Sequence, residues 1–171
     1  MIEVGAGSGA NFAHYPASVS EVLAVEPEAS LRERARRAAA LAPVTVGVRD
    51  AGAGDLPGET GSFDVGVASL VLCTVPDQQR ALAELFRVIR PGGELRFYEH
   101  VRAAQAGEQR VQRFADATFW PLIAGGCHLS RDTRAGIERA GFEIDSCRRF
   151  AFSPAAYLPP APHILGVARR P

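Results

Sequence analysis

Three glycines at alternate positions mark the first segment that could bind a ligand. Gly5, Gly7 and Gly9 directly follow the short apolar run at residues 1–4. Because glycine has no side chain, the backbone can turn tightly there and approach a ligand closely. The same spacing also fits the G-x-G-x-x-[GA] loop of dinucleotide-binding proteins, with Ala10 in the third position. The loop therefore predicts a cofactor site but leaves two kinds of cofactor open.

Polar side chains that could do chemistry stand near the ends of later apolar runs. Glu26 closes the run at residues 22–25, and an ionised carboxylate only accepts hydrogen bonds. Glu99 and His100 follow the run at residues 94–98, at the edge where an open α/β sheet places its ligands, with a solvated surface pair as the alternative. His128 is a further residue able to take up a proton, although it could equally line a turn.

The cysteines do not form a recognisable metal or disulfide pattern. Cys73, Cys127 and Cys147 are an odd number at wide spacing without a C-x-x-C pair. We therefore expect no metal site and no disulfide framework, and a reducing cytoplasm is the default location. A buried free cysteine is the alternative to a nucleophile at Cys73 and Cys127.

Alternating short apolar runs and helical patterns must position these residues. Strands are expected at residues 1–4, 22–25, 44–48, 63–72, 94–98, 142–150 and 164–168, the last two joined by a loop rich in Pro and Ala. Helices are expected at residues 30–41, from Asp77 as N-cap to before Pro91, at 103–120, and at 130–140 with Ser130 as N-cap and Gly141 after the end. Residues 50–61 have turn chemistry. The pattern predicts an α/β fold with a Rossmann-like, doubly wound, mostly parallel sheet and an antiparallel C-terminal edge.

The composition favours a small-molecule substrate in one domain. The 171 residues suffice for a single core, so residues 1–171 are expected to form one domain. Nineteen basic residues balance nineteen acidic ones, which disfavours nucleic-acid binding. The chain contains no lysine, so lysine-based catalysis is excluded. The longest apolar run, residues 65–75, is too short to span a bilayer, and no membrane anchor is expected in this chain.

Four segments together resemble the class I S-adenosylmethionine (SAM) dependent methyltransferases. They are Glu3 with the glycine loop, Glu26, the Ser62-Phe63-Asp64 triplet, and Arg87-Val88-Ile89-Arg90-Pro91-Gly92-Gly93. In that family the glycine loop wraps the methionine end of the cofactor, and the acidic residue after the second strand accepts hydrogen bonds from the ribose hydroxyls. The resemblance implies SAM as cofactor and these contacting residues: Glu3, Gly5, Ala6, Gly7, Gly9, Glu26, Pro27, Gly52, Ala53, Ser69 and Leu70. No acidic residue lies within Gly52-Ala53-Gly54, where the family usually has one for the adenine; Asp50 and Asp55 flank this stretch.

A closer resemblance covers nearly the whole chain. It rests on Glu3 to Pro16, Ser69 to Val75, Glu99-His100-Val101, Gly126 to Arg131 and Pro162 to Gly166, which are similar to the methyltransferase-like thiol S-methyltransferases with a methyltransferase type 11 domain. The resemblance implies methyl transfer to a small molecule, with an alkyl thiol as the candidate acceptor and O, N or C acceptors left open. His100 and His128 are the hypothetical catalytic bases.

Two other functions stay open at this stage. One is a nicotinamide-dependent oxidoreductase of the dinucleotide fold, although the chain has no Tyr-x-x-x-Lys pair. The other is a non-catalytic cofactor-binding remnant. It is suggested because the resembling family has helices and the start of the first strand ahead of the glycine loop, so that this chain is expected to be N-terminally truncated. The oligomeric state is not predicted.

Overall fold

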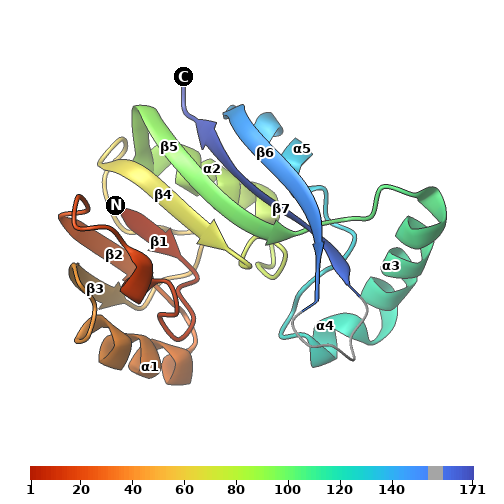
Figure 1. Ribbon diagram of the computed structural model, residues 1–171, viewed down its shortest axis with the longest axis horizontal. Helices are drawn as coiled ribbons and strands as arrows, with labels where there is room; N and C mark the ends of the chain where they lie inside the picture. The colour runs from red at the N-terminus through yellow and green to blue at the C-terminus, as the bar shows by residue number, and fades with distance from the viewer. Residues whose placement is uncertain (154–159) are drawn as a thin grey trace.

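The fold is a seven-stranded sheet with helices packed against it (Figure 1). The structure is a computed structural model that describes residues 1–153 and 160–171. The strands are β1 (Ile2–Val4), β2 (Glu21–Val25), β3 (Thr45–Arg49), β4 (Phe63–Ser69), β5 (Ile89–His100), β6 (Glu143–Phe152) and β7 (Ala161–Arg169). The helices are the short 3-10 helix η1 (Phe12–His14), α1 (Ala29–Ala39), α2 (Gln78–Val88), α3 (Ala106–Thr118), α4 (Trp120–Ile123) and α5 (Thr133–Arg139).

The strand order is β3-β2-β1-β4-β5-β7-β6. Strands β1 to β5 pair in parallel, and β7 is antiparallel to both β5 and β6. The predicted α/β fold with a mostly parallel sheet and an antiparallel C-terminal edge is therefore confirmed. Within that edge β7 is inserted between β5 and β6, so that β6 is the outermost strand. The expected Pro- and Ala-rich loop between β6 and β7 falls on residues 154–159, outside the described residues.

The largest apolar core lies between the sheet and helices α2 and α5. The buried stripe of α2 consists of Ala81, Leu82, Leu85 and Val88, and it packs in one cluster with Leu95 and Phe97 of β5. A second, smaller cluster joins α1 and η1 to the β2–β3 side of the sheet. In Figure 1, α2 and α5 lie behind the sheet, whereas α3 and α4 extend away from it.

Three helix boundaries differ from the sequence-based expectation. Helix α2 has Asp77 as N-cap, as expected, but ends at Val88, and the Pro91-Gly92-Gly93 turn already belongs to β5. The N-cap of α5 is Asp132, whose carboxylate accepts the N–H of Ala135 at 3.2 Å, and not Ser130. The expected helix at 103–120 is interrupted at Phe119, which separates α3 from α4.

The strand expected at residues 63–72 ends at Ser69. Its next residue, Leu70, has a φ of 55°, the one positive φ among the described residues other than glycine. Because a β-strand requires negative φ, the strand cannot continue through this residue. The segment from Leu70 to Val75 is instead a loop between β4 and α2.

Candidate functional site

The predicted cofactor residues start the loops at one edge of the sheet. Val4 of β1 lies opposite Val25 of β2 and Ala68 of β4, and Val25 lies opposite Arg49 of β3. Because these strands are parallel, the loops that follow them begin side by side (Figure 1). The sheet thus brings together the glycine loop, Glu26, the 50–61 loop and the end of β4.

The glycine loop is held in a conformation that needs glycine. Gly5 has a φ of 64°, and a Cβ atom there would lie 2.3 Å from Cγ2 of Val71. Gly9 also has positive φ, and a Cβ there would lie 2.7 Å from the ring of Phe12. Gly5 therefore permits close packing on the β4–α2 loop, and Gly9 permits close packing on η1. Ala6 is buried, and its N–H donates to the carbonyl of Val25.

Glu26 joins the glycine loop to the end of β2. Its side chain is buried, Oε2 accepts the N–H of Gly7 at 2.9 Å, and Oε1 accepts the N–H of Glu28 at 2.9 Å. A carboxylate has about four lone-pair positions, so these two donors leave acceptor capacity for further donors. The remaining acceptor positions of Glu26 therefore fit a ligand that donates from two neighbouring hydroxyl groups, as the ribose of SAM does.

Glu3 is buried but is already engaged by the loop that follows it. Its carboxylate accepts hydrogen bonds from Asn11 Nδ2 at 2.9 Å and from the Tyr15 hydroxyl at 2.7 Å. Burial raises the pKa of Glu3, and the two hydrogen bonds partly oppose this. Burial and the adjacent Glu3 also raise the pKa of Tyr15. The Glu3 side chain thus fixes the shape of residues 11–15.

Arginines hold the loops that carry Pro27, Gly52 and Ala53. Arg32 of α1 donates to the carbonyls of Glu26 and Pro27 and pairs with Asp50 at 2.9 Å. The Arg32 side chain is only 13% exposed, so Arg32 is part of the loop packing and not of a solvated helix face.

The 50–61 loop is anchored from α2. Arg80 donates to the carbonyl of Gly54 at 2.7 Å, Glu84 accepts the N–H of Leu56 at 2.8 Å, and Arg87 donates to the carbonyls of Leu56 and Gly58. Arg87 opens the Arg-Val-Ile-Arg-Pro-Gly-Gly motif, so the motif is linked to this loop as well as to the start of β5. The sequence did not reveal these contacts, because the partners lie 26 to 31 residues apart.

Ser69 ends β4, which pairs with the strand that precedes the glycine loop, and Leu70 follows it. Leu70 is 45% exposed, and its N–H donates to the carbonyl of Tyr98 at 2.7 Å. Leu70 is therefore held in its left-handed conformation by β5 while its side chain reaches solvent.

His100 is a buried imidazole without a hydrogen-bond partner. Its exposure is 6%, and neither ring nitrogen has a partner among the described residues. Burial lowers the pKa of His100 to about 4, with a smaller contribution from His163. His100 contacts the ring of His163 edge-on, and His163 stacks on Tyr98 and Phe150. The imidazole is thus neutral at physiological pH, and the expected alternative of a solvated Glu99-His100 pair is excluded because both residues are buried.

His128 lies beside the β4–α2 loop. Its backbone N–H donates to the carbonyl of Cys73 at 2.8 Å, and the ring nitrogen Nδ1 lies 2.9 Å from the carbonyl of Gly126. If Nδ1 carries the proton for that bond, Nε2 is an acceptor. Arg131 bonds to the carbonyl of Leu72 at 2.7 Å, so it joins the segment after His128 to the same loop.

The cysteines of these two segments face each other. Cys73 is buried and Cys127 is half-buried, and both are free thiols. Their mutual hydrogen bond raises the pKa of Cys73, which burial also raises, and lowers the pKa of Cys127. Cys147 lies apart from them on β6. Across residues 1–153 and 160–171, no three His, Cys, Asp or Glu side chains gather as metal ligands would.

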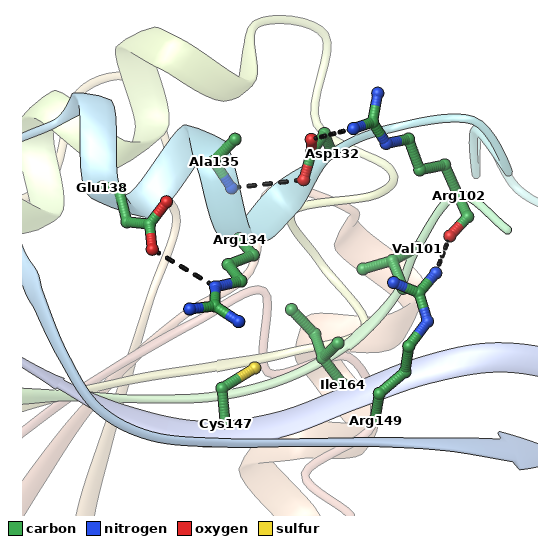
Figure 2. A pocket seen from close by; sticks show the side chains of 9 residues that line it. All are labelled: Val101, Arg102, Asp132, Arg134, Ala135, Glu138, Cys147, Arg149 and Ile164. Carbon is green, nitrogen blue, oxygen red and sulfur yellow. Dashed lines mark hydrogen bonds and ion pairs between the residues drawn. The ribbon is translucent and has the colours of Figure 1, made fainter. Parts of the chain in front are cut away.

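Two of the cavities that the described residues form lie against the sheet. One, of about 1110 Å³, runs across β4, β5, β7 and β6 and reaches Asn11, Tyr15, Ser69 and Tyr98, so it adjoins the predicted site. The other, of about 310 Å³, lies beside α5 and contains Cys147 (Figure 2). Its charged side chains include the pairs Arg102–Asp132 and Arg134–Glu138, and no predicted site residue lines it. The first cavity is therefore the one relevant to the site.

Comparisons with known proteins agree with this geometry. The methyltransferase domain family matches residues 2–97. The chain is similar in fold to a SAM-dependent methyltransferase from Methanosarcina mazei, with a TM-score of 0.77, 20% identity, and coverage of 99% of this chain and 91% of that one. It is similarly close to the [4+2]-cyclase SpnF, with a TM-score of 0.77, 20% identity, and coverage of 99% and 73%. The fold and the glycine loop with its acidic partner thus define a SAM-dependent methyltransferase domain.

A relative similar in sequence shows which family of methyltransferases the chain belongs to. Thiol S-methyltransferase TMT1B of Mus musculus is 36% identical over 176 residues, which cover 98% of this chain and 69% of the relative. The chain therefore belongs to the methyltransferase family that contains the thiol S-methyltransferases, and its cofactor is SAM. The nicotinamide-dependent oxidoreductase is not supported by these findings. No helix in the described part of the chain combines the length and apolar character needed to cross a bilayer.

Proposed function

We propose that this chain transfers the methyl group of SAM to the sulfur of a small-molecule thiol. The observation that carries the proposal is the neutral, unpartnered imidazole of His100 at the edge of the sheet where the cofactor loops begin. The choice of sulfur is supported by the similarity to thiol S-methyltransferases. The cyclase SpnF has a similar fold, which indicates that the fold alone does not determine the methyl acceptor.

In this proposal the glycine loop and the neighbouring loops hold the cofactor. Glu26 would accept hydrogen bonds from the ribose hydroxyls, and Gly52, Ala53 and Pro27 would border the adenine. The residues that would surround the methionine end are Glu3, Gly5, Ala6, Gly7, Gly9, Ser69 and Leu70. SAM supplies a methyl group bound to a positively charged sulfur. This sulfur leaves as a neutral thioether, so the leaving group needs no acid. The chain's own contribution is therefore to position, to desolvate and to accept a proton.

Removal of the proton from the acceptor thiol is the step that needs a side chain. A free thiol has a pKa near 8.5, so only a small fraction is thiolate at neutral pH. Neutral His100 has ring nitrogens without a hydrogen-bond partner among the described residues, and Nε2 of His128 is the second candidate. Burial lowers the pKa of His100 to about 4, so it is a weaker base than an exposed histidine.

An acceptor series tests this function. The purified chain is incubated with SAM and an alkyl thiol, or with the alcohol and the amine of the same carbon skeleton, and release of S-adenosylhomocysteine is measured. We expect turnover with the thiol and none with the other two. Turnover with the alcohol or amine, but not with the thiol, would contradict the proposed acceptor; SAM binding without any turnover would support a non-catalytic cofactor-binding protein.

Variants of the two histidines test the catalytic assignment. His100→Gln and His128→Gln, alone and combined, should reduce turnover with the thiol and leave the Kd for SAM unchanged. Turnover in the double variant equal to that of the wild type removes both residues from the mechanism.

A small-molecule acceptor and a cytoplasmic location stay predictions.

A further inference from the structure

Glu99 is a charged residue in the apolar interior that the proposed mechanism does not use. It precedes His100 on β5, and its side chain is 0% exposed. Because neighbouring residues of a strand point to opposite faces, Glu99 and His100 serve different sides of the sheet. A buried carboxylate is destabilising unless hydrogen bonds compensate for its lost hydration, so its partners indicate its role.

Three backbone N–H groups of one loop donate to the Glu99 carboxylate, and the Cys73 side chain of the same loop is hydrogen-bonded to it as well. Oε1 accepts the N–H groups of Val71 at 3.0 Å and Leu72 at 2.9 Å, and Oε2 accepts the N–H of Cys73 at 3.1 Å. Complete burial raises the pKa of Glu99, and these three donors oppose that shift. Three consecutive amides turned toward one carboxylate fix the path of the β4–α2 loop.

The carbonyls of the same loop are also satisfied within the chain. Leu72 O accepts from Gln78 Nε2 at 3.0 Å and from Arg131 at 2.7 Å, and Cys73 O accepts from the N–H of His128. The loop is therefore held on one side by α2 and the segment that precedes α5, and on the other by Glu99.

This loop determines the shape of the proposed cofactor site at two points. It begins at Leu70, in the left-handed conformation that L-residues rarely adopt. It then places the side chain of Val71 against Gly5, so close that a Cβ on Gly5 would lie 2.3 Å from it. A shift of Val71 therefore changes both the position of Ser69 and Leu70 and the packing under the glycine loop.

We propose that Glu99 is a positioning residue, which sets the SAM affinity by holding residues 70–73 against the glycine loop without contacting the cofactor. The inference rests on the proposed placement of Ser69, Leu70 and Gly5 in the cofactor site, and it is independent of the methyl acceptor. It assigns to the glutamate of the Glu99-His100 pair a role distinct from that of the histidine.

Glu99→Gln tests the proposal with little change in side-chain size. The amide has one oxygen, and its NH₂ group must face at least one backbone N–H, so at least one of the three bonds is lost. We expect the Kd for SAM, measured by calorimetry without an acceptor, to rise about tenfold or more, as for the loss of a charge-assisted hydrogen bond. Amide hydrogen exchange at Val71, Leu72 and Cys73 should become faster, and kcat at saturating SAM should stay close to that of the wild type.

Asp116→Asn is the matched control. Asp116 is likewise a carboxylate that accepts several bonds from one loop: the N–H groups of Leu129 and Ser130, at 2.7 and 2.9 Å, and the Ser130 hydroxyl. Its substitution should accelerate exchange at Leu129 and Ser130 and leave the Kd for SAM unchanged. A general loss of stability affects both variants, whereas a positioning role raises the Kd only in the Glu99 variant.

The possible outcomes separate this inference from the proposed function. Faster exchange at residues 71–73 with an unchanged Kd overturns the positioning role, as does an unchanged exchange rate. If Glu99→Gln does not fold, Glu99→Asp replaces it, because it keeps the charge but is one methylene shorter; we expect an intermediate rise in Kd, and no rise overturns the role. A wild-type chain that binds SAM but methylates no thiol contradicts the proposed acceptor and leaves the role of Glu99 standing.

Discussion

Glu26 connects two segments of the proposed cofactor site through one buried carboxylate. The N–H groups of Gly7 and Glu28 donate to its two oxygens. Those bonds orient the remaining acceptor positions. They come from the glycine loop and from the turn before α1, so both segments depend on this side chain.

Glu26→Gln should therefore weaken cofactor binding more than it weakens the fold. The amide cannot accept on both sides, so either a backbone bond or a ribose contact is lost, and we expect the Kd for SAM to rise about tenfold or more. Calorimetry measures this change. Glu28→Gln is the control, because the Glu28 carboxylate caps α1 at an exposed position. An equal loss of affinity in both variants would contradict the ribose role.

His100 should make the stability of the chain depend on pH. Its pKa is about 4 in the folded chain, against an ordinary value of 6.5, so between these values the unfolded chain binds a proton that the folded chain does not. This contribution to stability is complete above pH 6.5 and declines as the pH falls toward 4. The expected loss is about 2 kcal/mol between about pH 7.5 and about pH 5.

Urea unfolding of the wild type and of His100→Gln measures this contribution. The free energy of unfolding should fall more in the wild type than in the variant over that pH range. His14→Gln is the control, since His14 is exposed on η1. If the wild type and His100→Gln lose equal stability, the imidazole is not the titrating group.

Among the elements, the start of α5 shows how tertiary contacts decide between two adequate caps. Ser130 and Asp132 both favour an N-cap position, and the sequence favoured Ser130. In the structure the Ser130 hydroxyl and N–H bind Asp116 of α3, so Asp132 accepts the N–H of Ala135. The choice depends on a residue that lies 14 positions away and could not be foreseen from local preference.

Replacing the Asp132 cap should destabilise the chain measurably. Asp132→Ala is expected to lower the free energy of unfolding by about 1 kcal/mol, through the lost cap bond. Asp132→Asn should retain most of that stability, because asparagine also caps well and the half-exposed pair with Arg102 contributes little. Thermal or urea unfolding gives both values; similar losses in the two variants would mean that the charge, and not the cap, is what matters.

The sequence predicted those elements whose pattern is local. The strands of the parallel sheet followed from apolar runs, and α2 followed from the helical pattern that begins at the Asp77 N-cap. The early end of β4 was missed because the conformation of Leu70 depends on β5, through the carbonyl of Tyr98. Glu99 was noticed only as one of a pair at a strand end, since its partners, 26 to 28 residues away, are backbone amides that no motif displays.

For the whole molecule, cofactor binding should appear as a gain in stability. A ligand that binds only the folded chain stabilises it by about 2.7 kcal/mol when its free concentration is 100 times its Kd. SAM should therefore raise the thermal unfolding midpoint by several degrees, and NADH at the same concentration should not. A shift with NADH and none with SAM would contradict the methyltransferase assignment. Differential scanning calorimetry provides the measurement.

The position of β7 has a consequence for the order in which the molecule can be completed. The sheet order places β7 between β5 and β6, and both of these strands pair with it. During synthesis β6 leaves the ribosome before β7 has been made. Until then the edge of β5 that pairs with β7 has no partner. The antiparallel end of the sheet can therefore close only after β7 has been synthesised, so β6 must fold onto the sheet later than the parallel strands.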